Sequence, residues 1–213
     1  MSAVVAVDLN NPDEHVLQRA AQLVRSGGMI VYPTETLYGI GADATNPGAV
    51  KRVTEAKKRT ERKPILVLVD SVEMMSPLVE AVPLAARILI QGYWPGPLTL
   101  VFNASDRVPA ELTQGGKTIG IRIPSSRLCL RLLAHLGTPL TSTSANVSGG
   151  TPARTVDKIQ SELAGVDLYL DAGELPESLP STVVDVSGRS PRLLRNGAIP
   201  AEQIQQVLPG TLL

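Results

Sequence analysis

Short apolar runs in this 213-residue chain alternate with longer stretches where apolar residues recur about every three or four positions. Short runs that are bounded by glycine, proline or small polar residues are typical of buried strands. Strands are therefore predicted at residues 4–7, 29–31, 65–69, 98–102, 118–123, 139–143, near 168, at 182–186 and at 192–194.

The longer amphipathic stretches predict helices, and several carry start and stop signals. The segment 11–14 reads as a capped start with Pro12 in the first helical position and Glu14 closing a capping box, and Gly27-Gly28 ends that helix after Arg25. Further helices are predicted at 47–58, as two short helices within 71–91 broken at Pro83, at 126–136, at 156–164 and from 200 onward.

Strands and helices alternate without an internal repeat or a linker. Several predicted strands follow one another with no helix between them, so parallel and antiparallel pairs should occur in the same sheet. We therefore expect an α/β fold with a twisted mixed β-sheet and flanking helices, in a single domain that covers residues 1–213. A hydrophobic fraction of 43% is sufficient for a substantial core.

Composition favours a cytoplasmic protein that does not enter a membrane. No apolar stretch reaches the roughly 20 residues of a membrane-spanning helix, and the first residues do not resemble a secretory signal. Cys129 is the only cysteine and lies among leucines, so we expect it in the core rather than in a disulfide or a catalytic site. The formal net charge is zero, which gives no overall attraction to nucleic acid.

The sequence does not support several common kinds of catalytic or binding site. His15 and His135 are the only histidines, too few for a zinc cluster and a poor basis for a Ser-His-Asp triad. Segment 115–118 resembles the end of a phosphate-binding loop, but Glu111 stands where the first glycine is needed. Segment 39–44 matches a dinucleotide-binding pattern, yet Asn46-Pro47 follows where the helix should run.

Charge is unevenly distributed although it sums to zero. Residues 51–63 hold seven cations and two acids, whereas residues 157–177 hold six acids and one lysine. A solvated helix face explains Lys51 and Arg52, which can pair with Glu55. Lys57 and Arg59 lie beyond the helix, and such crowded cations usually need an anion between them.

Two hydroxyl-rich segments, 32–41 and 141–150, each follow a predicted strand and suit a ligand cradle. A turn stabilised by side-chain hydrogen bonds explains the second segment equally well. Together with the cationic cluster, Arg122 favours a ligand site, because it interrupts an apolar strand and needs a carboxylate or phosphate partner. Together these features predict a ligand, or a pair of ligands, with two anionic groups.

These segments together resemble the YrdC family of L-threonylcarbamoyladenylate synthases. The similarity rests on the run 32–39, the K-x-R of Lys57 and Arg59, segment 94–99, Arg122, the S-x-N of Ser144 and Asn146, and Ser181-Thr182, which occur in the family's order from about residue 10 to 200. The resemblance is to the short, single-domain form of the family, so no second domain is expected after this region. The resemblance implies a large concave basic cavity.

The resemblance also implies an activity. A nucleotidyltransferase of this family joins L-threonine, bicarbonate or carbon dioxide, and ATP into threonylcarbamoyl-AMP and pyrophosphate, for threonylcarbamoyladenosine modification of tRNA by a separate transferase complex. By position, the implied L-threonine site comprises Thr36, Arg122, Ser142 and Ser181. The implied ATP site comprises Lys57, Arg59, Lys63, Thr118, Ser144, Asn146 and Arg195, with Lys57 and Arg59 as the catalytic residues.

The implied cofactor is Mg²⁺ carried by the phosphates of ATP, since the loops offer no dedicated carboxylate cage. Glu35 is the acid best placed to contact that ion, and the alternative is that it anchors its loop. Many longer relatives have a histidine where Leu68 stands and a serine in the loop that here reads 152–154, so those contacts are not carried over.

A second hypothesis is a double-stranded RNA-binding or ribosome-maturation protein that uses the same basic cavity. Residues 51–63 are a plausible phosphate footprint for weak RNA contact. The low aromatic fraction of 3% and the zero net charge count against it.

Overall fold

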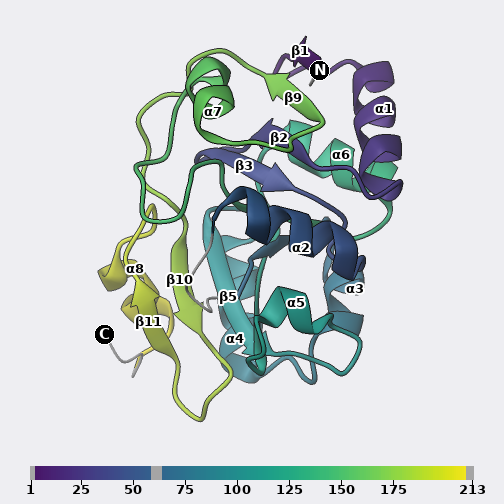
Figure 1. The fold of residues 1–213 in the computed structure, drawn as a ribbon. Helices are drawn as coiled ribbons and strands as arrows, with labels where there is room; N and C mark the ends of the chain where they lie inside the picture. The colour runs from purple at the N-terminus through teal and green to yellow at the C-terminus, as the bar shows by residue number, and fades with distance from the viewer. Residues whose placement is uncertain (1–2, 59–63, 210–213) are drawn as a thin grey trace.

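The computed structural model describes residues 3–58 and 64–209, and its strands form two mixed sheets (Figure 1). The upper sheet of Figure 1 has the order β1 (Ala3–Ala6), β9 (Leu168–Asp171), β2 (Ile30–Pro33), β3 (Tyr38–Gly41) and β8 (Thr143–Ser144). The lower sheet has the order β11 (Arg192–Arg195), β10 (Thr182–Asp185), β5 (Leu98–Asn103), β6 (Thr118–Arg122), β4 (Val67–Leu68) and β7 (Leu140–Thr141).

The helices pack around both sheets. In the upper part of Figure 1, α1 (Glu14–Arg25) lies beside α6 (Arg127–Leu136), and α7 (Val156–Glu162) lies on the opposite side. The remaining helical segments are α2 (Pro47–Ala56), α3 (Val72–Met75), the 3₁₀ turn η1 (Ser76–Leu78), α4 (Leu84–Tyr93), α5 (Ala110–Thr113) and α8 (Ala201–Val207). Within the described ranges, no helix is long and apolar enough to cross a membrane.

The mixed α/β class predicted from the sequence is confirmed, but the strands are divided between two sheets. Both sheets contain parallel pairs, such as β1 with β9 and β10 with β5, and antiparallel pairs, such as β2 with β3 and β5 with β6. The predicted strand at 139–143 is the point of division, because β7 belongs to the lower sheet and β8 to the upper sheet.

Two local predictions were wrong. The segment 32–41 is a β-hairpin rather than a loop, because β3 pairs with β2 in antiparallel register. Its second strand was hidden by Gly39 and Gly41, which have low strand propensity but are needed for packing. A Cβ atom on Gly41 would lie 2.7 Å from the Tyr32 ring. The first helix is capped by Asp13, which accepts the His15 N–H, so Pro12 lies outside it.

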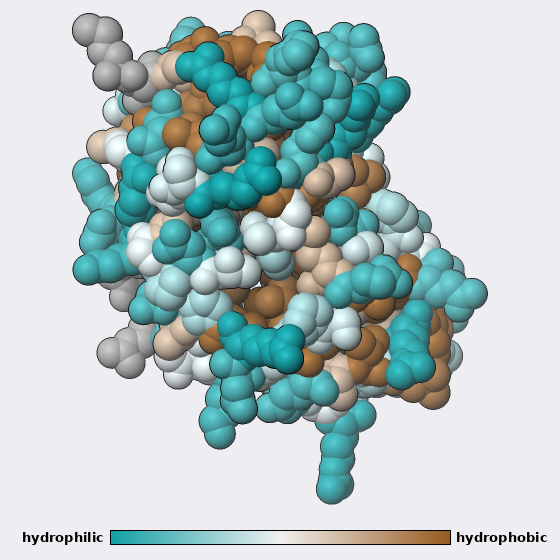
Figure 2. Space-filling view, turned by 90° about the vertical axis from the view of Figure 1, so that its right-hand side faces the viewer, coloured by the Kyte–Doolittle hydropathy of each residue, from teal (hydrophilic) through white to brown (hydrophobic). Residues whose placement is uncertain are grey.

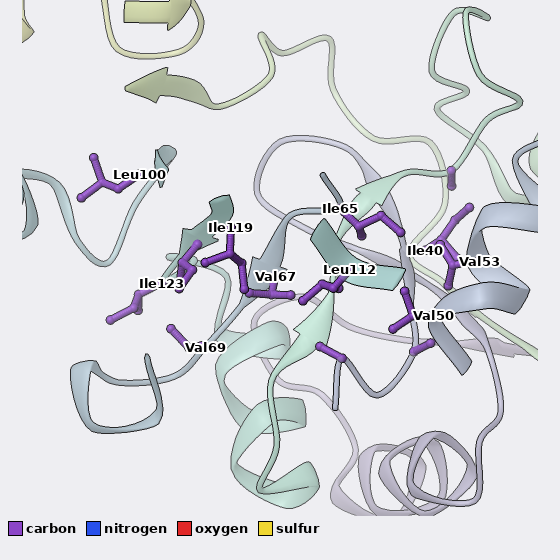
Figure 3. Close-up of a cluster of buried hydrophobic side chains, with 14 of the residues drawn as sticks. Ile40, Val50, Val53, Ile65, Val67, Val69, Leu100, Leu112, Ile119 and Ile123 are labelled. Carbon is purple, nitrogen blue, oxygen red and sulfur yellow. The ribbon is translucent and has the colours of Figure 1, made fainter. Parts of the chain in front are cut away.

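The core has two parts that follow from the alternation of apolar residues. One packs α2, α5 and the inward faces of β4 to β6 against β3, and Figure 3 shows Ile40, Val53, Ile65, Val67 and Ile119 within it. The other joins α1 and α6 beneath β2 and contains the buried Cys129, as predicted. On the outer face seen in Figure 2, hydrophilic and apolar residues are mixed.

Candidate functional site

A cavity of about 880 Å³ is lined by residues of both sheets. Strand β6 forms the floor of the cavity, because successive side chains of a strand point to opposite faces. Thr118, Gly120 and Arg122 face the cavity. Ile119 and Ile121 face the core. The hairpin β2–β3 and strand β8 contribute the opposing wall, and a segment after β9, including residues 176–178, closes one side.

This cavity brings together predicted site residues from five parts of the chain. Those that line it are Thr36, Thr118, Arg122, Ser142, Ser144, Ser181 and Arg195. Lys57 and Asn146 are described but are not among its lining residues. Arg59 and Lys63 lie outside the described residues, so their predicted contacts with ATP stay predictions.

Lys57 supports the Ser144–Asn146 turn from within the protein. The side chain is 4% exposed, and its Nζ donates hydrogen bonds to the carbonyl oxygens of Ser144 and Asn146, the latter at 2.8 Å. Asn146 in turn donates its amide N–H groups to the carbonyls of Val147 and Gly150. Both side chains thus shape the turn that carries Ser144 into the cavity, and direct contact with phosphate stays a prediction for each.

Arg122 has the anionic partner that its place in an apolar strand requires, and that partner belongs to the protein. Its Nη1 lies 3.3 Å from Glu35 Oε1 and donates to Thr36 Oγ1, also at 3.3 Å. The Arg122 side chain is only 4% exposed, yet its Nε has no hydrogen-bond partner among the described residues. Since Arg122 also lines the cavity, a ligand that carries an acceptor would supply a further partner for its guanidinium.

Glu35 is not one of the cavity-lining residues, although its neighbours Thr34, Thr36 and Leu37 are. Its contact with a metal on ATP stays a prediction, and its ion pair with Arg122 favours the alternative, an anchor inside the hairpin. Residues 3–58 and 64–209 hold no group of three side chains that could bind a metal ion.

Thr36 lines the cavity and can present an acceptor to it, because its hydroxyl accepts one hydrogen bond from Arg122. Thr34 Oγ1 lies 3.0 Å from Thr36 Oγ1, but it donates its proton to the Leu37 carbonyl at 2.7 Å and accepts the backbone N–H groups of Thr36 and Leu37, both at 3.1 Å. Arg122 donates to Thr36 Oγ1 at 3.3 Å. A hydroxyl has one proton and two lone pairs, so one lone pair remains for a ligand N–H or O–H.

Arg195 and Thr99 form a second polar group on the opposite side of the cavity. Arg195 donates from Nε to the Ser181 carbonyl and from Nη2 to Ser181 Oγ, both at 3.0 Å. Thr99 Oγ1 lies 2.8 Å from the same Ser181 hydroxyl. Partial burial and the nearby charge of Arg122 lower the pKa of Arg195. Two mutually repelling guanidinium groups on one cavity favour an anionic ligand between them.

Sequence reasoning missed several cavity residues. Thr99 lies in segment 94–99 and was not predicted to be a site residue, although its place between Leu98 and Leu100 on β5 was a signal. Arg154, Glu177 and Asp185 also line the cavity, where Arg154 pairs with Glu174 at 3.2 Å. The lining thus includes three arginines and two acids, and the strongly basic cavity stays a prediction because several cations of 51–63 are not described.

Comparison with known proteins gives consistent results. Residues 22–197 match the model of the Sua5/YciO/YrdC family, described as "Telomere recombination". The chain is 36% identical over 197 residues to the threonylcarbamoyl-AMP synthase of Pyrococcus abyssi, covering 92% of this chain and 58% of that protein. It is 38% identical over 190 residues to a putative threonylcarbamoyl-AMP synthase of Mycobacterium tuberculosis, covering 89% and 87%.

A solved structure supports the same relationship. The crystal structure of P. abyssi Sua5 complexed with L-threonine matches with a TM-score of 0.93 and 33% identity, over 99% of this chain and 62% of that chain. This chain thus spans less than two thirds of the P. abyssi protein. Matches in sequence and fold that extend over most of the chain show that it belongs to the Sua5/YciO/YrdC family.

Proposed function

We propose that this protein is a threonylcarbamoyl-AMP synthase that uses L-threonine, bicarbonate or carbon dioxide, and ATP. The observation that carries the proposal is the cavity, where two arginines and a set of hydroxyl groups from both sheets face one space. Relatives named for this activity, and a similar fold solved with L-threonine, support it.

In the proposed amino-acid site, Arg122 binds the carboxylate of L-threonine through the N–H groups that Glu35 and Thr36 leave available. Thr36 Oγ1 accepts a hydrogen bond from the amine, and Ser142 and Ser181 complete the site. Fixing the amine in this way positions its nitrogen to attack carbon dioxide, with loss of one proton, to give a carbamate.

The carbamate oxygen then attacks the α-phosphorus of ATP, and the bond to pyrophosphate breaks. Ser144, Thr118 and Arg195 line the cavity where the triphosphate would lie, and Lys57 and Asn146 hold the turn of Ser144 in place. We extend the ATP site to Arg59 and Lys63 on the basis of sequence alone. Cations and hydroxyl groups suffice, since phosphoryl transfer depends mainly on positioning and charge neutralisation.

Mg²⁺ is proposed as a companion of ATP. The described part of the chain has no cluster of three metal-ligating side chains, which suits an ion held mostly by phosphate oxygens and water. When bound, such an ion neutralises charge on the phosphates.

The deciding experiment is pyrophosphate release from ATP by the purified chain. We expect release only when L-threonine and bicarbonate are both present, and the nucleotide product should be threonylcarbamoyl-AMP by mass spectrometry. Release that is independent of L-threonine, or none at all from folded protein with Mg²⁺, would contradict the proposal.

The alternative function in RNA binding is not favoured, because the matching relatives are named synthases. We propose that the product instead passes to a separate tRNA threonylcarbamoyl transferase complex. We also propose that the protein acts in the cytoplasm, because its proposed substrates and tRNA are found in that compartment.

A further inference from the structure

Glu35 lies in the turn of the β2–β3 hairpin, directly behind the polar wall of the cavity. Its side chain is 17% exposed, and Oε1 lies 3.3 Å from Arg122 Nη1. Neither carboxylate oxygen accepts a hydrogen bond from any residue that the structure describes. A buried carboxylate with so few partners costs free energy, so its charge interaction with Arg122 is what compensates for its burial.

Two buried ionisable groups near Arg122, Cys129 and Tyr32, are neutral. Burial, with a smaller contribution from the charge of Glu35, raises the pKa of the Cys129 thiol to about 12. Burial likewise raises the pKa of the Tyr32 hydroxyl, which donates to the Thr141 carbonyl at 3.1 Å. Among the described residues, Glu35 is the acid that lies within ion-pair distance of Arg122, while Arg195 supplies a second positive charge nearby and Glu177 and Asp185 line the same cavity.

The contacts of Arg122 are arranged asymmetrically. Glu35 and Thr36 both lie next to Nη1, whereas Nε has no partner among the described side chains. A guanidinium that is fixed at one nitrogen keeps its plane and offers its remaining N–H groups in a set direction. Such preorganisation saves the free energy of ordering the side chain when a carboxylate binds.

We propose that Glu35 is a positioning residue that orients Arg122 for the carboxylate of the amino-acid substrate. This inference rests on the proposed function, in which Arg122 binds that carboxylate. Glu35 acts through Arg122 and does not contact the substrate, since only its neighbours in the turn line the cavity. Its removal should weaken recognition of the carboxylate and leave ATP binding unchanged.

The test is calorimetric titration of L-threonine and of L-threoninamide, which lacks the carboxylate, into wild type, Glu35→Gln and a control, Glu55→Gln. Glu55 is an exposed carboxylate on α2 that pairs with Lys51 at 3.9 Å. We expect Glu35→Gln to weaken L-threonine binding about tenfold, or ~1.4 kcal/mol. Its affinities for L-threoninamide and ATP should equal those of wild type, and Glu55→Gln should bind all three normally.

Arg122→Met and the double variant complete the cycle. If Glu35 acts through Arg122, adding Glu35→Gln to Arg122→Met causes no further loss of L-threonine binding. Equal losses for L-threonine and L-threoninamide would overturn the inference, as would unchanged L-threonine affinity with an altered Mg²⁺ requirement for turnover.

Two safeguards keep the result interpretable. Wild-type protein that binds no L-threonine would refute the proposed function itself, whereas normal wild-type binding with an unaffected Glu35→Gln variant would refute only the role of Glu35. If Glu35→Gln does not fold, Glu35→Asp keeps the charge but shortens the side chain by one methylene. An about threefold weaker L-threonine affinity is then expected, and wild-type affinity would overturn the inference.

Discussion

Two of the three arginines that line the cavity, Arg122 and Arg195, lie in contrasting surroundings. Arg122 lies on an interior strand, is almost fully buried and has a carboxylate 3.3 Å away. Arg195 lies on the exposed edge strand β11, and within the described residues its side chain donates hydrogen bonds to the carbonyl and hydroxyl of Ser181. Arg122 is thus held in one geometry with its charge balanced, and Arg195 keeps its positive charge with more freedom.

One residue type can thus serve two tasks. A neutralised, fixed guanidinium recognises the shape of a carboxylate, because its hydrogen-bond directions are set in advance. An exposed guanidinium without a countercharge attracts a phosphate mainly through its positive charge, and salt screens that attraction.

Replacing the buried arginine should have the largest effect. Arg122→Met should reduce turnover by at least about a hundredfold, since a charged hydrogen-bond partner of the substrate is lost. It also leaves the Glu35 carboxylate buried without its counter-charge, which should lower the free energy of unfolding by about 3–5 kcal/mol. Urea denaturation and steady-state kinetics measure the two losses.

The double variant Glu35→Gln/Arg122→Met is the control for that stability loss. Removing both charges should recover most of the unfolding free energy while turnover stays low. A single variant as stable as wild type would show that the pair is not the compensated contact that its burial indicates.

Removing the hydroxyl acceptor beside Arg122 should have an intermediate effect. Thr36→Val keeps the side-chain volume but removes the lone pair offered to the substrate amine, so KM for L-threonine should rise about tenfold. KM for ATP should not change. Thr54→Val on α2, where the hydroxyl donates to the Val50 carbonyl, is the matched control and should leave both values as in wild type.

A smaller effect is expected at the cavity rim. Arg195→Gln should raise KM for ATP by about threefold to tenfold at low salt, and the difference should shrink as ionic strength rises. Arg192→Gln, on the same strand but outside the cavity lining, is the comparison. A salt-independent loss would mean that Arg195 acts by shape, as Arg122 does.

The smallest effect is expected far from the cavity, where Glu14 of α1 pairs with His135 and Arg131 of α6. The hydrogen bond to His135, followed by the charge of Arg131, lowers the pKa of Glu14 below its ordinary value of 4.5. A lowered folded-state pKa means that this stabilisation is present above pH 4.5 and is lost as pH falls through the folded pKa.

Glu14→Gln should therefore make the urea midpoint less dependent on pH in the acid range, with little change in turnover at neutral pH. Midpoints measured from about pH 6 down to about pH 3 test this expectation. An unchanged slope would show that this exposed cluster contributes nothing measurable.

Most of the fold could be predicted because apolar alternation encodes the faces of its strands. In β6, Ile119 and Ile121 alternate with Thr118, Gly120 and Arg122, which places the first pair in the core and the others on the cavity. Strand β3 could not be found in the same way, because its glycines are present for contact with Tyr32 rather than for strand propensity.

The site was predicted less completely. An arginine within an apolar strand signals a buried partner, but the sequence could not tell a ligand from Glu35, which is distant along the chain. The direction of Lys57 was also unpredictable, because a long flexible side chain takes its partners from tertiary structure. Its basic neighbours in sequence suggested phosphate, whereas the described contacts are loop carbonyls.

The passage of the chain between the sheets at Thr141–Ser144 has a mechanical consequence. Thr141 pairs through its backbone with Val67 in the lower sheet, while its hydroxyl accepts the Ala42 N–H and donates to the Ile40 carbonyl. Ser142, the next residue, bonds to the Leu66 carbonyl and faces the cavity. A ligand bound beside Ser142 would contact both sheets at the point where the chain passes from one to the other. Ligand binding should therefore make the two sheets unfold in a single thermal transition.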